Sequence, residues 1–133
     1  GASKSFHSGL VVYSNEMKQK LLNISQNTID SEGAVSESVV REMARNALSM
    51  CSANYVIAVT GVAGPEGGTK EKPVGTVWLC WGTEQNLKSC CLFWPLERNL
   101  FQTLIAASGL DLIRRHIKNL DPLPNYLMQK VVD

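Results

Sequence analysis

A stretch rich in glycine and proline in the middle of the chain constrains the fold most. Residues 60–77 read TGVAGPEGGTKEKPVGTV and separate two short apolar runs, YVIAV and VWLCW. Each run has the length of a strand and is rich in β-branched or aromatic residues, which predicts two buried strands. The stretch itself cannot continue either strand, because glycine and proline interrupt regular structure. It therefore predicts a wide loop between two buried strands.

The segments around this loop alternate between strand and helix patterns. FHSGLVVYS at 6–14 predicts a strand, and NEMKQKLLNI predicts a helix that begins near Asn15. GAVSESVVREMARNALSM, at 33–50, has apolar residues at helical spacing behind Ser36, a typical N-cap. LKSCCLFW at 87–94 predicts a third strand near the loop, joined by a hairpin turn at TEQN.

A long amphipathic helix is predicted for residues 99–119, with Gly109 as its weak point. The whole order is strand, helix, helix, strand, strand, strand, helix. This order predicts an α/β fold: a three-layer α/β/α sandwich with a mixed sheet between its helices. We expect one domain over residues 1–133, in which the tail at 121–133 stays unassigned. The apolar residues expected on the core side of the long helix are Leu100, Phe101, Leu104, Ile105, Leu112, Ile113 and Ile117.

Composition excludes several classes of partner. The 133 residues are 44% hydrophobic and 19% charged, which is typical of a soluble globular protein. The formal net charge is +1 and the basic residues are scattered, so the basic stripe of a nucleic-acid-binding protein is missing. Apolar runs are too short to span a bilayer. We expect no nucleic-acid or membrane partner.

The cysteines do not suggest a metal site. None of the four forms a C-x-x-C pair, and the two histidines lie far from them in the sequence. Isolated cysteines in apolar surroundings usually pack as small core residues in a reducing compartment, so we expect a cytoplasmic protein without bound metal. The cysteines are Cys51, Cys80, Cys90 and Cys91, and the histidines are His7 and His116.

Spacing excludes two phosphate-binding motifs in the glycine-rich loop. A P-loop needs glycine directly before Lys and Ser or Thr, whereas this chain has Gly68-Thr69-Lys70-Glu71. A dinucleotide fingerprint enters a helix, but this loop runs into another strand. A plain strand connection and a substrate-facing loop both remain open. Thr60 favours the second reading, because it ends a buried strand where α/β proteins place ligand crevices, and the glycines let backbone amides approach a ligand.

Four segments in order resemble one known family. AVTGVAGPEGGTKEKPVGTVWL looks like the signature of the CinA C-terminal family, whose members deamidate nicotinamide mononucleotide. GLVVYSNEMKQKLLNI and GAVSESVVREMA are similar to two earlier family segments, and PLERNLFQTLIAASGLDLI to its closing helix. The resemblance covers most of residues 1–120 and implies the family's three-layer fold.

The resemblance implies a serine amidohydrolase that uses lysine as its base. Its reaction converts nicotinamide mononucleotide and water to nicotinic acid mononucleotide and ammonia, with no cofactor or metal. Arg98 suits the substrate phosphate, because its planar fork binds two oxygens at once. Carried over position by position, the catalytic residues are Tyr13 and Lys18, and the substrate-binding residues are Thr60, Gly61, Gly64, Gly67 and Arg98.

The chemistry of Lys18 is consistent with that role. It falls in the first turn of the predicted helix, where the positive helix end and partial burial both lower the pKa of an amine. A neutral-pH base requires that direction. The Tyr13 hydroxyl would relay a proton or hold the amine. Without the family pattern, Lys18 reads as an ordinary solvated surface lysine.

One part of the family pattern is missing. The nucleophilic serine of the family lies upstream in a segment like ESCTGG, which this sequence lacks, and Ser3, Ser5, Ser8 and Ser14 have no comparable context. The upstream piece is a separate or cleaved chain, has been left out of this sequence, or is absent from a natural remnant. The last case makes the chain a catalytically silent nucleotide-binding or interaction module. Because apolar surface would be uncovered, we expect a homo-oligomer or association with the missing segment.

Overall fold

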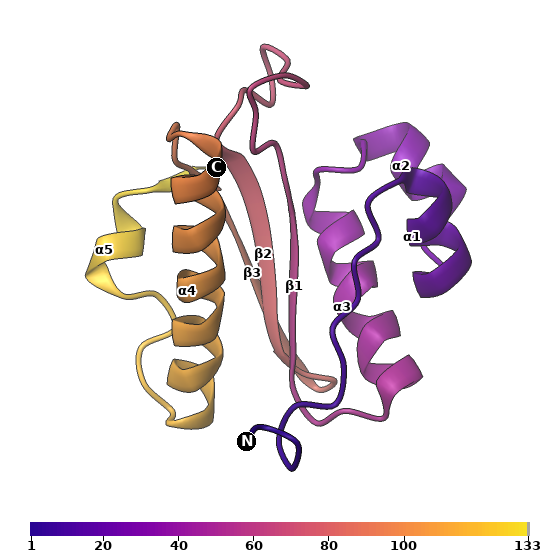
Figure 1. The fold of residues 1–133 in the computed structure, drawn as a ribbon, viewed down its shortest axis with the longest axis vertical. Coiled ribbons are helices and arrows are strands. Elements are labelled where there is room, and N and C mark those ends of the chain that lie inside the picture. The colour runs from indigo at the N-terminus through magenta and orange to yellow at the C-terminus, as the bar shows by residue number, and fades with distance from the viewer. Residues whose placement is uncertain (133) are drawn as a thin grey trace.

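The computed structural model describes residues 1–132 and places helices on both faces of one sheet (Figure 1). This confirms the α/β class and the helix layers on either side. In the described part of the chain, no helix is both long and apolar enough to cross a membrane. The elements are α1 (Asn15–Leu22), α2 (Gln26–Glu32), α3 (Glu37–Cys51), β1 (Val56–Gly61), β2 (Thr76–Thr83), β3 (Asn86–Phe93), α4 (Arg98–Ile117), α5 (Asn125–Met128) and β4 (Val131–Val132).

The sheet has the order β1-β2-β3-β4, and every pairing in it is antiparallel. The prediction of a mixed sheet was therefore wrong. β1, β2 and β3 follow one another along the chain, and neighbours joined by a loop or hairpin turn run antiparallel. β4 reaches the edge of β3 after α4 and α5, and it is antiparallel as well. The segment before α1, which was expected to supply a further strand, forms none in the described structure.

Residues 6–13 run alongside the α3 layer without regular structure (Figure 1). The strand predicted here was wrong, because no neighbouring strand supplies the backbone hydrogen bonds that a strand needs. Val12 alone is buried, at 7% exposure, while Val11 is 88% exposed. Helix α1 then begins behind Ser14, whose hydroxyl accepts a hydrogen bond from the Met17 amide, so Ser14 and not Asn15 is the N-cap.

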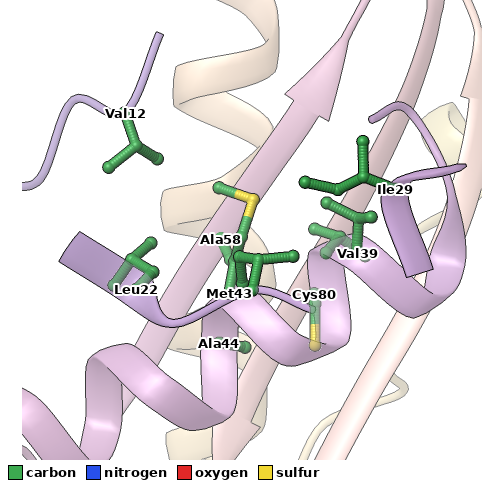
Figure 2. Packing of buried hydrophobic residues seen from close by; sticks show 10 residues of the cluster. Val12, Leu22, Ile29, Val39, Met43, Ala44, Ala58 and Cys80 are labelled. Carbon is green, nitrogen blue, oxygen red and sulfur yellow. The ribbon is translucent and has the colours of Figure 1, made fainter. Parts of the chain in front are cut away.

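Two apolar clusters hold the layers together. The first joins α1, α2 and α3 to β1 and β2, with Val39, Val40 and Ala44 fully buried (Figure 2). Ser36 caps α3 as predicted, while α2 was missed because its sequence, QNTIDSE, carries a single apolar residue. The second cluster packs α4 and α5 against β2 and β3, around Leu79, Leu92, Leu112 and Leu127.

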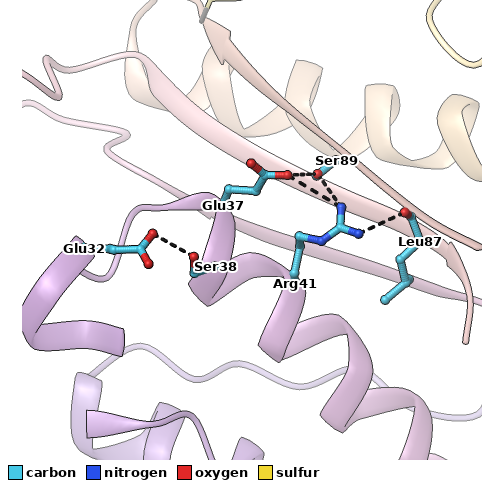
Figure 3. Close-up of polar contacts among 6 residues, drawn as sticks. All are labelled: Glu32, Glu37, Ser38, Arg41, Leu87 and Ser89. Atoms are coloured by element: carbon cyan, nitrogen blue, oxygen red, sulfur yellow. Dashed lines mark hydrogen bonds and ion pairs between the residues drawn. The ribbon is translucent and has the colours of Figure 1, made fainter. Parts of the chain in front are cut away.

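A polar cluster ties α3 to the far edge of its sheet face. Arg41 donates to the Ser89 hydroxyl at 2.7 Å and to the Leu87 carbonyl at 3.3 Å, and Ser89 donates to Glu37 at 2.6 Å (Figure 3). These contacts join α3 to β3. They fix the start of α3, which lies close to the end of β1 where the glycine-rich loop begins.

Helix α4 lies against the opposite face. Gly109 is buried at its centre, where an added Cβ would come within 3.1 Å of Ile57 on β1, so glycine permits close packing there. Leu100 and Ile117 were expected on the core side but are 49% and 53% exposed. They lie on the outward face of a helix that is apolar on more than one side.

Candidate functional site

Lys18 is a buried cation at the start of a helix. It is the fourth residue of α1 and is only 8% exposed, and its ammonium donates to the Tyr13 carbonyl at 3.1 Å. Burial lowers the pKa of Lys18 below the ordinary 10.5, because removal of water disfavours the charged form. The amine is therefore not the solvated surface group that its sequence context alone indicates.

The Tyr13 side chain points away from this contact. It is 86% exposed, and among the described residues no hydrogen bond involves its hydroxyl. The carbonyl of Tyr13, a group that every residue carries, holds the amine. The Tyr13 hydroxyl was expected to relay a proton or to hold the amine, and its catalytic role stays a prediction.

Thr60 and Gly61 anchor the start of the glycine-rich loop. The Thr60 hydroxyl is buried and donates to the Ala34 carbonyl at 2.8 Å, which ties β1 to the connection between α2 and α3. An added Cβ on Gly61 would come within 2.9 Å of the Thr76 carbonyl oxygen, so this position requires glycine. Both residues shape the loop; neither presents a free polar group to a ligand in this structure.

Backbone hydrogen bonds join the two ends of the loop, and Arg98 binds its middle. Val62 donates to the Thr76 carbonyl and Gly75 to the Val62 carbonyl, each at 2.8 Å. Gly64 and Gly67 have φ of +77° and +89°, which L side chains rarely adopt. Arg98, the first residue of α4, donates to the Gly64 carbonyl at 2.6 Å. The structure thus brings Arg98 and the loop together, as the resemblance implied.

A shallow cleft of about 360 Å³ lies beside the second half of the loop. Its floor belongs to the α3 side of the sheet, where Trp78 pairs with Cys91 and Cys91 with Val132. Sequence reasoning missed this cleft, although the alternation of side chains along the two strands places Thr76 and Trp78 on one face. Its lining residues are Glu71, Lys72, Pro73, Thr76, Trp78, Cys91, Phe93 and Val132.

The predicted site residues form two groups in the structure. Lys18 and Tyr13 make one, and the loop with Thr60 and Arg98 makes the other. Among residues 1–132 no hydrogen bond joins the groups. Two of the serines near the start of this chain have structural partners. Ser14 caps α1, and the Ser8 hydroxyl lies 2.9 Å from the Cys51 sulfur.

Comparison with known proteins decides the family. The model of the CinA C-terminal domain matches residues 1–117. The chain belongs to the CinA C-terminal domain family. A CinA-like protein of Colwellia psychrerythraea is 49% identical over 130 residues, which are 98% of this chain and 30% of that protein. A CinA-like protein of Thermosipho melanesiensis is 43% identical over 117 residues, 86% of this chain and 29% of its own length.

Solved structures of CinA proteins share the fold. The competence/damage inducible protein CihA of Agrobacterium tumefaciens superposes with a TM-score of 0.74 at 33% identity, over 77% of this chain and 63% of that one. A CinA superfamily protein of Klebsiella pneumoniae gives 0.73 at 28% identity, over 81% and 68%. This CinA-family chain thus spans about a third of the curated relatives named above and about two-thirds of these solved chains.

Proposed function

We propose that this chain carries the base and the substrate loop of a nicotinamide mononucleotide amidohydrolase. Lys18 is the observation that carries the proposal. A lysine that is 8% exposed as a residue, with a pKa lowered by burial, is costly to keep for structure alone. Its position matches the catalytic lysine that the CinA resemblance implies.

The proposed reaction needs a serine from outside the 133 residues. The serine oxygen attacks the carboxamide carbon while the Lys18 amine takes the hydroxyl proton. That proton then passes to the departing nitrogen, ammonia leaves, and an ester joins the serine to the nicotinoyl group. Water, deprotonated by the same amine, attacks this ester, the proton passes from the amine to the departing serine oxygen, and nicotinic acid mononucleotide is released. The protons balance, and each step uses one base.

The loop and Arg98 supply binding and charge stabilisation in this proposal. Backbone amides of the glycine-rich loop would stabilise the oxyanion, because preorganised donors act where charge develops. Arg98 already donates to the Gly64 carbonyl, which leaves the other nitrogens of its guanidinium for the substrate phosphate. It would thereby orient the loop and the nucleotide together.

The open edge of β1 is the place we propose for the serine segment. In the described sheet β1 is an edge strand, and its Val59 is 39% exposed. Residues 6–13 form no strand, and their Val12 belongs to the same apolar cluster as Ala58 of β1, while Phe6 and Leu10 are exposed. A strand added at this edge would satisfy the free backbone groups of β1 and cover exposed apolar side chains.

A catalytically silent nucleotide-binding or interaction module is the second candidate. The observation that favours it is the Tyr13 side chain, which is 86% exposed and whose hydroxyl makes no hydrogen bond to another described residue. A binding or interaction module does not need this phenol to be engaged in catalysis.

Ammonia release from nicotinamide mononucleotide tests the proposal. We expect turnover by a form that contains an ESCTGG-like segment, either as a longer chain or added as a separate peptide to the 133-residue chain. Lys18→Ala should abolish turnover. Lys20→Ala is the matched control, because Lys20 lies on the same helix, is exposed and pairs with Glu16 at 2.6 Å. Equal turnover in the Lys18→Ala and Lys20→Ala variants would refute Lys18 as the base, and no turnover in any form favours the silent module.

A further inference from the structure

Helix α4 carries an apolar stripe on the side that faces away from the sheet. Its buried side is formed by Phe101, Ile105, Ser108, Gly109 and Leu112. On the opposite side Leu100 is 49% exposed, Leu110 is 65% exposed and Ile117 is 53% exposed. Large apolar side chains that are exposed along one side of a helix mark a surface that a partner can cover. We define the outward stripe as Leu100, Thr103, Ala107, Leu110, Arg114 and Ile117.

The spacing of the outward stripe is that of a helix-pairing seam. Its six residues follow one another at intervals of three and four, which is the a/d pattern of a coiled coil. The small residues Thr103 and Ala107 sit between the larger ones and allow another helix to approach closely. Arg114, the one charged member, is held by Asp111 on its own helix at 2.6 Å. The stripe is therefore apolar along most of the 20 residues of α4.

We infer that the outward stripe binds the same stripe of a second copy, with the two α4 helices antiparallel. When two outward stripes run in opposite directions, the residues of one copy face residues of complementary size on the other. Leu100 then lies opposite Ile117 of the second copy, and Ala107 opposite Leu110 of the second copy. Each large side chain in the middle meets a small one, as close packing requires. A two-fold axis between residues 108 and 109 generates both contacts, so the interface is isologous.

Charge also favours this orientation. Glu97, the exposed N-cap residue, precedes α4, while the last turn of α4 carries Arg114, Arg115 and His116 and is followed by Lys118. An antiparallel pair brings Glu97 of each copy to the flank where Lys118 of the other lies. It also places opposite ends of the two helix dipoles together. In a parallel pair, Arg114 would face Arg114 of the second copy and Lys118 would face Lys118, so that like charges would repel.

Sedimentation velocity over a micromolar to near-millimolar series tests the dimer. We expect the wild-type chain to dimerise, and Leu110→Glu to raise the dimer dissociation constant at least about tenfold, because pairing would bury a charge without a partner. Gln102→Glu is the control, since Gln102 is exposed on the same helix but lies off the stripe. Unchanged thermal unfolding of the monomers would show that both variants fold. A wild-type monomer at every concentration, or equal weakening by both variants, would overturn the inference.

Disulfide cross-linking tests the orientation. Leu100 and Ile117 are 17 positions apart, about 25 Å along one helix, so cysteines there cannot join within one chain. In a Cys51→Ser background, the double variant Leu100→Cys with Ile117→Cys should give a covalent dimer, and either single variant should not. A dimer formed by the Leu100→Cys variant alone would refute the antiparallel pair.

A longer form of the chain gives a further test. If that form stays monomeric and its α4 is protected from hydrogen exchange, its additional residues cover the outward stripe, and the inference is overturned.

Discussion

The Lys18 ammonium donates its hydrogen bond to the backbone carbonyl of Tyr13, 3.1 Å away, while the Tyr13 ring is 86% exposed. The two residues are thus joined through the main chain. Ser14 caps the helix between them, so the N-cap and the ammonium contact together fix how the chain enters α1. The amine is positioned by local folding, before any substrate or added segment is considered.

The pKa of Lys18 is the first prediction. Burial lowers it, so titration by NMR of isotopically labelled lysine should give a midpoint below the ordinary 10.5. A midpoint at or above 10.5 would show that the amine is solvated, and it would remove the physical basis for a neutral-pH base.

Stability should follow the same titration. Between the lowered folded pKa and 10.5, the unfolded chain binds more protons than the folded one, so the free energy of unfolding rises with pH in that window. Lys18→Met has no such group, and its unfolding free energy should lack this rise. Urea denaturation of both proteins at a series of alkaline pH values measures the difference. Parallel pH curves for the two proteins would contradict the prediction.

The buried cysteines should resist modification. Burial raises the pKa of Cys80 to about 11 and that of Cys90 to about 12, and it also raises that of Cys91, so all three stay protonated at neutral pH. Cys51 is half-buried and lies at the end of α3. A thiol reagent at pH 7 should label Cys51 alone in the folded protein and all four cysteines in denaturant. Fast labelling of a second thiol in the folded state would show that the sheet opens readily.

Arg98 should stabilise the glycine-rich loop. Arg98→Ala removes the hydrogen bond to the Gly64 carbonyl, and we expect a loss of about 1–2 kcal/mol in unfolding free energy, since a hydrogen bond from a charged group is lost. Hydrogen exchange of the loop amides should accelerate in this variant. Thr103→Ala, which removes a hydroxyl contact on the same helix, should leave loop exchange unchanged. Equal exchange rates in the wild type and Arg98→Ala would show that Arg98 does not hold the loop.

Local patterns predicted those elements whose sequences alone decide their structure. Ser36 and the helical spacing after it predicted α3, and the two short apolar runs on either side of the glycine-rich loop predicted β1 and β2. The segment at 6–14 has an equally strong strand pattern, but it lacks a neighbouring strand to pair with in the described structure. Strand formation depends on a partner, which no local pattern contains.

Part of the candidate site was also predictable from the sequence, and part was not. The helix-start position of Lys18 was predicted from the sequence, whereas a place for Arg98 in the substrate site came only from the family resemblance. The burial of Lys18 depends on tertiary packing, which no spacing rule supplies. The cleft beside Trp78 and Cys91 depends partly on Val132, whose strand pairing across β3 joins residues distant in sequence.

Gly75 should be indispensable where the loop returns to the sheet. It has φ of +101°, and an added Cβ would come within 2.8 Å of the backbone of Trp94 and Pro95. Gly75→Ala should therefore lower the unfolding free energy by at least about 2 kcal/mol. Gly9→Ala is the control, because its added Cβ would meet only the Phe6 ring, at 3.6 Å. Equal denaturation midpoints for the two variants would refute this account of the loop.

The C-terminal segment should be an integral part of the fold, although the family model ends at residue 117. Leu127 is fully buried among Leu112 and the other residues of the second cluster, and Tyr126 donates to Asp111 at 3.0 Å. Leu127→Ala should therefore cost about 2–4 kcal/mol in urea unfolding, the usual range for a leucine truncated in a packed core. Met128→Ala, at a position 57% exposed, should change stability by less than about 0.5 kcal/mol. If the two variants unfold at the same urea concentration, the segment does not contribute to the core, and the β3 edge would be left open to other strands.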